Sequence, residues 1–279
     1  MSEEQVLKEV ESKNNKVKNE KKLAKKQLAL LKLVYRFRFV NSKQIARYFN
    51  QSYISAANSQ LTQLYERGYL GKRHDGTYRI QGRPAEYYLA TKSRAILKSE
   101  LDVVSKHELK RLYARPDNSS YFVNRSLQIF DIHLELNRLY GDRLNFFTKS
   151  QLNVEQFEYF PKPLPDAFMT ISGSTNRNYF VEYFDDDVSI GIHGRKIAGY
   201  IKYKESGQWD DTGADFPTVI FVCQSPLMLK KAEKRVRYLD RNEYSEIQFR
   251  LIDLDALKAL GGTKKKAWID PIKDTKIVL

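Results

Sequence analysis

Two acidic residues in the second half of the sequence have types and spacing that suit phosphodiester chemistry. Asp166 stands at the start of a strand-like run, LPDAFMTIS, and Glu182 lies inside the next strand-like run, YFVEYF, across a polar turn. Carboxylates at the ends of adjacent paired strands can share a Mg²⁺ ion, which activates water for attack on a phosphodiester. Asp166 and Glu182 are therefore the candidate metal ligands and catalytic residues.

The motif Pro165-Asp166 followed by a strand glutamate resembles the PD-(D/E)xK nuclease superfamily. That pattern has a lysine two residues after the glutamate, where this sequence has Phe184. The resemblance implies that Lys196, on the following helix, takes the place of this lysine, and that Glu135 adds a further carboxylate. The alternative is that these residues have no catalytic role. Asp166 is then a turn residue, Glu182 a paired structural acid and Lys196 a solvated helix residue. No cofactor is expected, apart from Mg²⁺ if the acidic pair is active.

Other residue types with catalytic or metal-binding chemistry form no recognisable constellation. The acidic run Asp185-Asp186-Asp187 is typical of a solvated loop, although it could bind a cation. The histidines lack metal-ligand spacing, and the single cysteine, Cys223, cannot form an intrachain disulfide. The sequence contains no glycine-rich phosphate loop and no Ser/His nucleophile signature.

The elements around the acidic pair alternate strands with helices and predict an α/β domain over residues 121–260. A helix, YFVNRSLQIFDIHLELNRLYG, leads into it and is expected to bury Phe122, Leu127, Phe130, Leu134 and Leu136. TVIFVC and IQFRLIDLDAL read as strands, whereas HGRKIAGYIKYKES and LMLKKAEKRVRYLDRN read as helices. Residues 261–279 are expected to form a Lys-rich tail.

The excess of positive over negative charge is confined to the first part of the chain. The 279 residues include 48 Lys and Arg against 34 Asp and Glu, a net charge of +14. Residues 1–115 carry 25 basic and 11 acidic residues, which accounts for the whole excess. This asymmetry points to a polyanionic partner, most often nucleic acid. The sequence has no run of about 18 apolar residues, the length that a membrane span needs. We therefore expect a cytoplasmic protein without a membrane partner.

The order of elements in residues 22–100 is typical of a winged helix-turn-helix. An amphipathic helix begins near Leu23, a short helix follows Asn41-Ser42, and the longer helix YISAANSQLTQLYERG ends at Gly68. The runs YLGKR, TYRI and AEYYLA read as short strands. We expect residues 1–21 to be a basic, flexible arm and residues 101–120 to be a connector.

The longer helix of this module has the surface of a DNA-recognition helix. Ile54, Ala57, Leu61 and Leu64 share the face expected to pack on the other helices. The opposite face is small and polar, which suits contact with base edges and phosphates in the major groove. The residues expected to contact DNA are Ser55, Ser59, Thr62 and Gln63 on this helix, Lys43 and Arg47 on the supporting helix, and Lys72, Arg73, Arg79 and Arg83 around the wing.

The order of motifs along the chain is similar to that of the replication-relaxation family of bacterial plasmids and mobile elements. The resemblance rests on YYLATKSRAIL, LPDAFMTI, YFVEYFDD, RKIAGYIKY and FPTVIFVC and covers roughly residues 28–240. It implies an α+β or α/β protein with an N-terminal winged helix-turn-helix and a restriction-endonuclease-like domain. It also implies a DNA-binding role in plasmid replication or its control.

Three functions are consistent with the sequence. The favoured one is sequence-selective binding of double-stranded DNA, with an inactive nuclease-like domain used for assembly or a second DNA contact. The first alternative is a Mg²⁺-dependent DNA endonuclease that the winged helix targets. The second is a protein-interaction scaffold whose basic residues only aid solubility. A homodimer and a partner from the replication machinery remain open.

Overall fold

The computed structural model describes residues 23–100, 119–152, 157–241 and 245–279. The expected N-terminal arm (1–21) and residues 101–118 of the expected connector lie outside these ranges. None of the helices described is long and apolar enough to cross a membrane.

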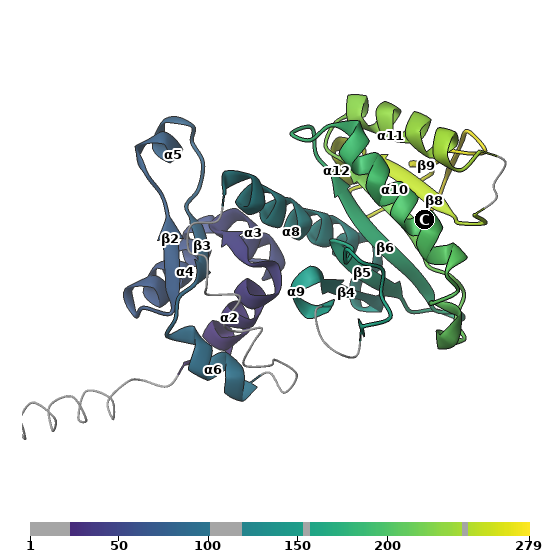
Figure 1. Ribbon diagram of the computed structural model, residues 1–279. Coiled ribbons are helices and arrows are strands. Elements are labelled where there is room, and N and C mark those ends of the chain that lie inside the picture. Colours follow the sequence, from purple (N-terminus) through teal and green to yellow (C-terminus); the bar gives the residue numbers. More distant parts are fainter. Residues whose placement is uncertain (1–22, 101–118, 153–156, 242–244) are drawn as a thin grey trace, which may run out of the picture.

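Residues 23–100 form the N-terminal module, in which helices pack around a small antiparallel sheet (Figure 1). The sheet has the strand order β1-β3-β2. In chain order the elements are α2 (Lys25–Phe37), β1 (Phe39–Asn41), α3 (Ser42–Tyr48), α4 (Ile54–Glu66), β2 (Leu70–Arg73), α5 (Gly76–Ile80), β3 (Glu86–Leu89) and α6 (Ser93–Glu100).

Local capping explains where the short helix α3 begins. The side chain of Asn41 accepts a hydrogen bond from the backbone N–H of Gln44, and the Gln44 side chain accepts one from the Asn41 N–H. This reciprocal pair satisfies two N–H groups that the first turn of a helix leaves free. The helix start predicted from Asn41-Ser42 is confirmed.

The expected inner face of α4 is buried along most of its length. Ala57, Leu61 and Leu64 are fully buried. Ile54 was expected on the same face but is 50% exposed, because it starts the helix and lies beyond the core. This part of the prediction was wrong.

The segment TYRI, expected as a strand, is part of the short helix α5 instead. Asp75 caps this helix, since its carboxylate accepts hydrogen bonds from the N–H groups of Thr77 and Tyr78. The strand that pairs with β2 is β3, with Lys72 opposite Tyr87. The intervening β2–β3 loop (residues 74–85) carries α5 and projects away from the rest of the protein (Figure 1).

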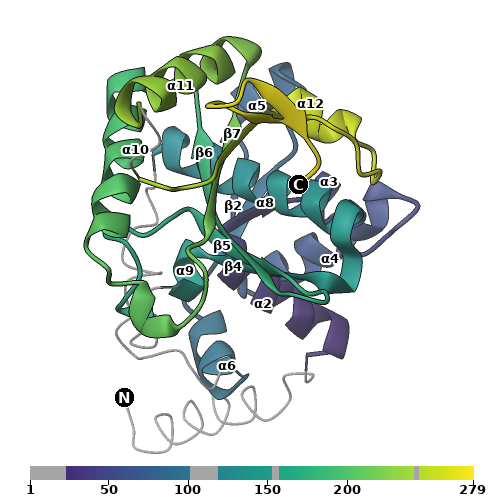
Figure 2. The ribbon, with the colours of Figure 1, turned by 90° about the vertical axis from the view of Figure 1, so that its right-hand side faces the viewer.

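The rest of the chain forms a seven-stranded mixed sheet with helices on both faces (Figures 1 and 2). The strand order is β10-β9-β8-β7-β6-β5-β4, with β6, β7 and β8 parallel and the other neighbours antiparallel. The elements are α8 (Ser120–Tyr140), η1 (Gly141–Arg143), β4 (Leu144–Thr148), α9 (Lys149–Leu152), β5 (Ala167–Ile171), β6 (Arg177–Phe184), α10 (Ile190–Glu205), η3 (Asp210–Thr212), β7 (Thr218–Cys223), α11 (Pro226–Leu239), β8 (Phe249–Asp253), α12 (Leu254–Ala259), β9 (Trp268–Asp270) and β10 (Thr275–Ile277).

The two faces of this sheet bury different side chains because successive residues of a strand point to opposite sides. On β6, Phe180 and Phe184 pack in the core beneath α10 and α11. Val181 and Tyr183 belong to the core on the α8 side. Both faces are covered, which is why YFVEYF reads as a nearly continuous apolar run.

The core on the α8 side continues into the N-terminal module. Leu31 of α2, Ile45 of α3 and Phe130 of α8 belong to one buried cluster with Met169 of β5 and Ile220 of β7. Helix α8 therefore packs against both halves of the described chain. The domain limits predicted from the sequence stay predictions, and the packing between the halves is continuous.

The α+β fold class is confirmed, with two further differences in detail. Phe122 on α8 was expected to be buried but is 36% exposed, whereas Leu127, Phe130, Leu134 and Leu136 are buried. Residues 261–279, expected as a tail, supply β9 and β10 at one edge of the sheet. The assignment of the N-terminal module as a winged helix-turn-helix stays a prediction.

Candidate functional site

Asp166 and Glu182 are neighbours across the β5–β6 strand pair. The register places Ala167 opposite Val181, so the preceding Asp166 lies beside the following Glu182. Asp166 is 7% exposed and Glu182 is 2% exposed. A side-chain oxygen of Asp166 accepts a hydrogen bond from the backbone N–H of Tyr183 at 2.9 Å, which fixes the carboxylate at this strand end.

Helix α10 brings Lys196 to both carboxylates. The Lys196 ammonium donates a short hydrogen bond to Glu182 Oε2 and lies 3.7 Å from Asp166 Oδ2. One helical turn further on, the Tyr200 hydroxyl donates to Glu182 Oε1 at 3.0 Å. The structure therefore brings together all three residues that the sequence singled out. Their catalytic role stays a prediction.

Arg125 of α8 is a fourth member of this cluster, and the sequence did not single it out. Its guanidinium donates to both oxygens of Asp166, with Nε 3.3 Å from Oδ1 and Nη2 in a short contact with Oδ2. Nη1 lies 2.6 Å from Asp185 Oδ2, and Nη2 also donates to the Tyr183 carbonyl at 2.8 Å. We call Arg125, Asp166, Glu182, Asp185 and Lys196 the ion cluster.

Burial and charge act in opposite directions on these groups. Burial penalises the charged form of Asp166, but Lys196 and Arg125 outweigh it and hold the pKa of the carboxyl well below its usual value. For Glu182 burial prevails and raises the pKa to about 7, although Lys196 opposes it. The nearby carboxylates raise the pKa of Lys196 and of Arg125, which burial alone would lower.

The residues as arranged do not fit a divalent metal ion. A Mg²⁺ ion needs about six oxygen ligands near 2.1 Å. Each oxygen of Asp166 and of Glu182 already accepts from a protein donor: Arg125 and Tyr183 on the first, Tyr200 and Lys196 on the second. Within the described residues, no group of three or more His, Cys, Asp or Glu side chains is arranged to hold a metal.

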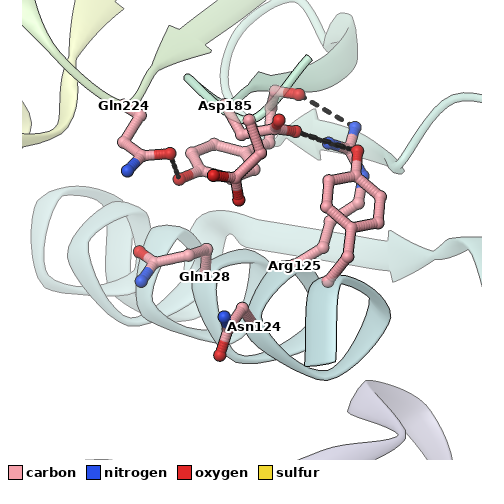
Figure 3. Close-up of a pocket in the computed structure, with 8 residues that line it drawn as sticks. Asn124, Arg125, Gln128, Asp185 and Gln224 are labelled. Carbon is pink, nitrogen blue, oxygen red and sulfur yellow. Dashed lines mark hydrogen bonds and ion pairs between the residues drawn. The ribbon is translucent and has the colours of Figure 1, made fainter. Parts of the chain in front are cut away.

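A small polar pocket of about 130 Å³ lies beside the ion cluster, between α8 and the ends of β6 and β7 (Figure 3). Asn124 and Gln128 line it from α8, and Asp185 and Gln224 line it from the strand ends (Figure 3). Arg125 lines the pocket, whereas Asp166, Glu182 and Lys196 do not. The Arg125 guanidinium therefore lies between the acidic pair and the pocket.

The second candidate surface is the outer face of α4. Ser55, Ser59 and Gln63 are exposed and Thr62 is half-buried, as expected for a face turned away from the core. Tyr53, immediately before the helix, is 75% exposed, and Ile54 is half-exposed beside it. This face of α4 therefore offers hydroxyl, amide and apolar groups without bulky charged side chains.

The basic residues expected near this face differ in what they contact. Lys43, Lys72 and Arg79 are exposed, and the Lys72 ammonium lies 5.9 Å from the centre of the Tyr65 ring. Arg47 instead bridges to α8, where Nη1 lies 3.1 Å from Asp131 Oδ1 and Nη2 contacts Glu135. Arg73 and Arg83, the two arginines nearest the base of the β2–β3 loop, also pair with a carboxylate.

Glu86, at the start of β3, is the partner of those two guanidiniums. It is 2% exposed and accepts from Arg83 at 2.8 Å, with Arg73 at 3.7 Å. The Tyr78 hydroxyl donates to the same carboxylate at 2.8 Å. Arg73 and Arg83 therefore hold the β2–β3 loop in place as well as adding positive charge.

One expected site residue lies elsewhere. Glu135 does not join the acidic pair, because its carboxylate contacts Arg47 and lies 3.2 Å from Arg138 Nη1. Sequence reasoning missed Arg125 and Glu86, and it placed Asp185 in a solvated loop, whereas Asp185 is 3% exposed and pairs with Arg125. The signal for Arg125 was a basic side chain on a mostly apolar helix that leads into a domain with buried acids.

A family model described as replication-relaxation matches residues 31–219 of the chain. The matched span contains α4, the β2–β3 loop, α8 and the ion cluster. No curated protein and no solved structure matches the chain.

Proposed function

The chain belongs to the replication-relaxation family, and from this membership we propose that it binds double-stranded DNA in plasmid or mobile-element replication or its control. In this proposal the N-terminal module is a winged helix-turn-helix. Helix α4 enters the major groove, and the β2–β3 loop is the wing. The sheet domain serves assembly or a second DNA contact.

The observation that carries the proposal is the exposed face of α4. Ser55, Ser59 and Gln63 project from it, and the helix has no acidic residue before Glu66 at its end. Small hydroxyl and amide side chains let a helix approach base edges closely and donate or accept hydrogen bonds there. An ordinary solvated helix would expose Lys and Glu instead.

The charge of the module supports a polyanionic partner. Residues 23–100 hold 15 basic and 4 acidic residues, which leaves +11 of the total of +14. Residues 1–21, expected as a basic arm, contain five Lys and five Glu and add nothing to the excess. Most of the excess positive charge therefore lies on the folded module, where it can act on phosphates beside α4.

The endonuclease alternative is favoured by one observation, the convergence of Asp166, Glu182 and Lys196. The contacts of Arg125 and the occupied carboxylate oxygens oppose it, because a metal ion would have to displace protein donors from both acids. DNA binding without cleavage is the function that the geometry supports better. A homodimer and a partner from the replication machinery remain proposals.

A charge placed on the face of α4 tests the proposal. Ser59→Glu puts a carboxylate where a phosphate or base edge would approach, so we expect at least about a tenfold weaker affinity for duplex DNA. The control is Ser99→Glu on α6, which makes the same change at another exposed serine. Fluorescence anisotropy at several salt concentrations measures both, with far-UV circular dichroism as the check on folding.

Two results of this experiment would contradict the proposal. One is equal DNA affinity for the Ser59→Glu variant and the wild-type protein. The other is wild-type binding that is absent, or that does not weaken between about 50 and 200 mM salt, because phosphate contacts release counterions and make binding salt-dependent.

A further inference from the structure

The ion cluster differs from a metal site in the source of its positive charge. In a metal site the cation is a bound ion, whereas here two side chains from two different helices supply it. Arg125 reaches the acids from α8, and Lys196 reaches them from α10 on the other side.

We propose that Arg125 is the resident cation of the acidic pair, in place of a metal ion, and that the ion cluster fastens α8 to the sheet. Asp166, Glu182 and Asp185 are all buried, at 7%, 2% and 3% exposure. Buried carboxylates need paired cations, because an uncompensated charge away from water is costly. Arg125 and Lys196 supply that compensation.

The geometry of the guanidinium explains why an arginine is needed. Its planar group directs Nε and Nη2 at Asp166 while Nη1 reaches Asp185 and Nη2 also reaches the Tyr183 carbonyl. A lysine at position 125 would lack the planar group that directs separate N–H donors at Asp166, Asp185 and the Tyr183 carbonyl, because its ammonium is a compact charge. The Tyr121 hydroxyl adds a 3.0 Å hydrogen bond to Asp185, one turn before Arg125 on the same helix.

The balance of charge agrees with a cluster that does not bind a further cation. Two cations face three carboxylates, so the cluster has at most one excess negative charge, and burial raises the pKa of Glu182, which reduces that excess further. The cluster thus carries little net negative charge with which to attract another cation. Arg125 also separates the acidic pair from the neighbouring pocket.

The position of α8 gives this cluster a consequence for the whole protein. Residues beside Arg125 on α8 contact the N-terminal module: Gln44 donates to the Leu127 carbonyl at 2.8 Å, and Arg83 lies 3.2 Å from the Asn124 oxygen. Fixing α8 on the sheet therefore also fixes the helix against which the module packs. The inference does not depend on DNA binding.

Mn²⁺ binding and thermal unfolding of the full chain test this inference. Electron paramagnetic resonance counts Mn²⁺ bound at pH 7.5 to the wild type and to the Asp166→Asn variant. We expect the two titrations to coincide and the melting temperature of the wild type to be unchanged by millimolar Mn²⁺. Binding by the wild type that is lost in Asp166→Asn would overturn the inference, because the acids would then be metal ligands.

Substitutions of Arg125 supply the second readout. Arg125→Met leaves the buried Asp185 without its arginine partner and Asp166 with Lys196 alone, so we expect the melting temperature to fall by roughly 6 °C or more. Arg125→Lys should fall between this variant and the wild type, because it keeps the charge and loses the fork. The control, Arg195→Met, removes an exposed arginine of α10 and should change little. An Arg125→Met variant that melts with the control would overturn the inference, and the Mn²⁺ result on the wild type holds whether or not this variant folds.

Discussion

Reversing two charges in and beside the β2–β3 loop, Lys72→Glu with Arg79→Glu, should weaken binding to duplex DNA by about 100-fold near 0.1 M salt. Both side chains are exposed. Each phosphate that the variant no longer neutralises keeps its counterion, so the slope of log affinity against log salt should also fall by about two. Anisotropy titrations over a range of salt concentrations give both quantities.

The choice of these two residues follows from the contacts of their neighbours. Arg73 and Arg83 also lie in this region, but both pair with the buried Glu86. Reversing either of them would place like charges together and disturb the loop itself, so a loss of affinity could not be assigned to DNA contact.

The matched control reverses Lys265 and Lys266, which are exposed between α12 and β9. This control changes the net charge by the same amount at a distant place. We expect its affinity to stay within about threefold of the wild type. Equal losses in the two double variants would mean that overall charge, and not a local surface, governs binding, which is the expectation for a scaffold with solubilising charges.

One buried histidine at the junction between the two halves should make a destabilising contribution that grows as the pH falls. His133 of α8 is 4% exposed and packs against the rings of Phe37 and Phe146 at 5.2 and 5.0 Å. Burial, with a smaller effect of Arg36, lowers its pKa to about 3. Among the residues that the structure describes, its Nδ1 atom has no hydrogen-bond partner.

The sign of the pH effect follows from the lowered pKa. Below the usual histidine pKa of about 6.5 the unfolded chain binds a proton that the folded protein does not, so the free energy of unfolding falls as the pH falls from 6.5 toward 3. The contribution at pH 4.5 is about 2 to 3 kcal/mol. Glu182, with its raised pKa, acts in the opposite direction over part of this range.

A comparison of variants isolates the contribution of His133. His133→Phe keeps an aromatic ring among the neighbouring aromatic side chains and removes the titrating group, so it should lose most of this acid sensitivity. Urea unfolding at pH 7.5 and 4.5 measures the difference, with His74→Phe as the control at an exposed histidine. If the free energy of unfolding of His133→Phe changes between these pH values in the same way as that of the wild type, the explanation is wrong.

The sequence predicted the long elements of the fold better than the short ones. Helices α8, α10 and α11 and strands β6 and β7 carry their own periodicity or apolar runs, and they lie where the patterns predicted them. Strand β1 has only three residues and exists because it pairs with β3. The run in α5 has β-branched and aromatic residues, yet the Asp75 cap turns it into a helix.

The candidate site could be predicted in part, namely where its residues lie on consecutive elements of the chain. Asp166 and Glu182 lie on consecutive strands, so a hairpin places them together, and Lys196 follows on the next helix. Arg125 precedes Asp166 by 41 residues, and its arrival at the acids depends on how α8 packs on the sheet. No local pattern encodes that packing. The missed residue is the one that decides how the cluster is neutralised.

Cross-linking from defined positions tests the DNA surface most directly. The only cysteine, Cys223, is fully buried, and burial raises the pKa of its thiol, so an introduced cysteine would be the one reactive thiol. A photoreactive group can then be attached at Ser59→Cys on α4, at Thr77→Cys on α5, or at Lys265→Cys far from both. We predict cross-links to labelled duplex DNA from the first two positions and none from the third. Cross-links confined to the Lys265→Cys protein, or equal yields from all three, would contradict the assignment of α4 and the β2–β3 loop as the surface that binds DNA.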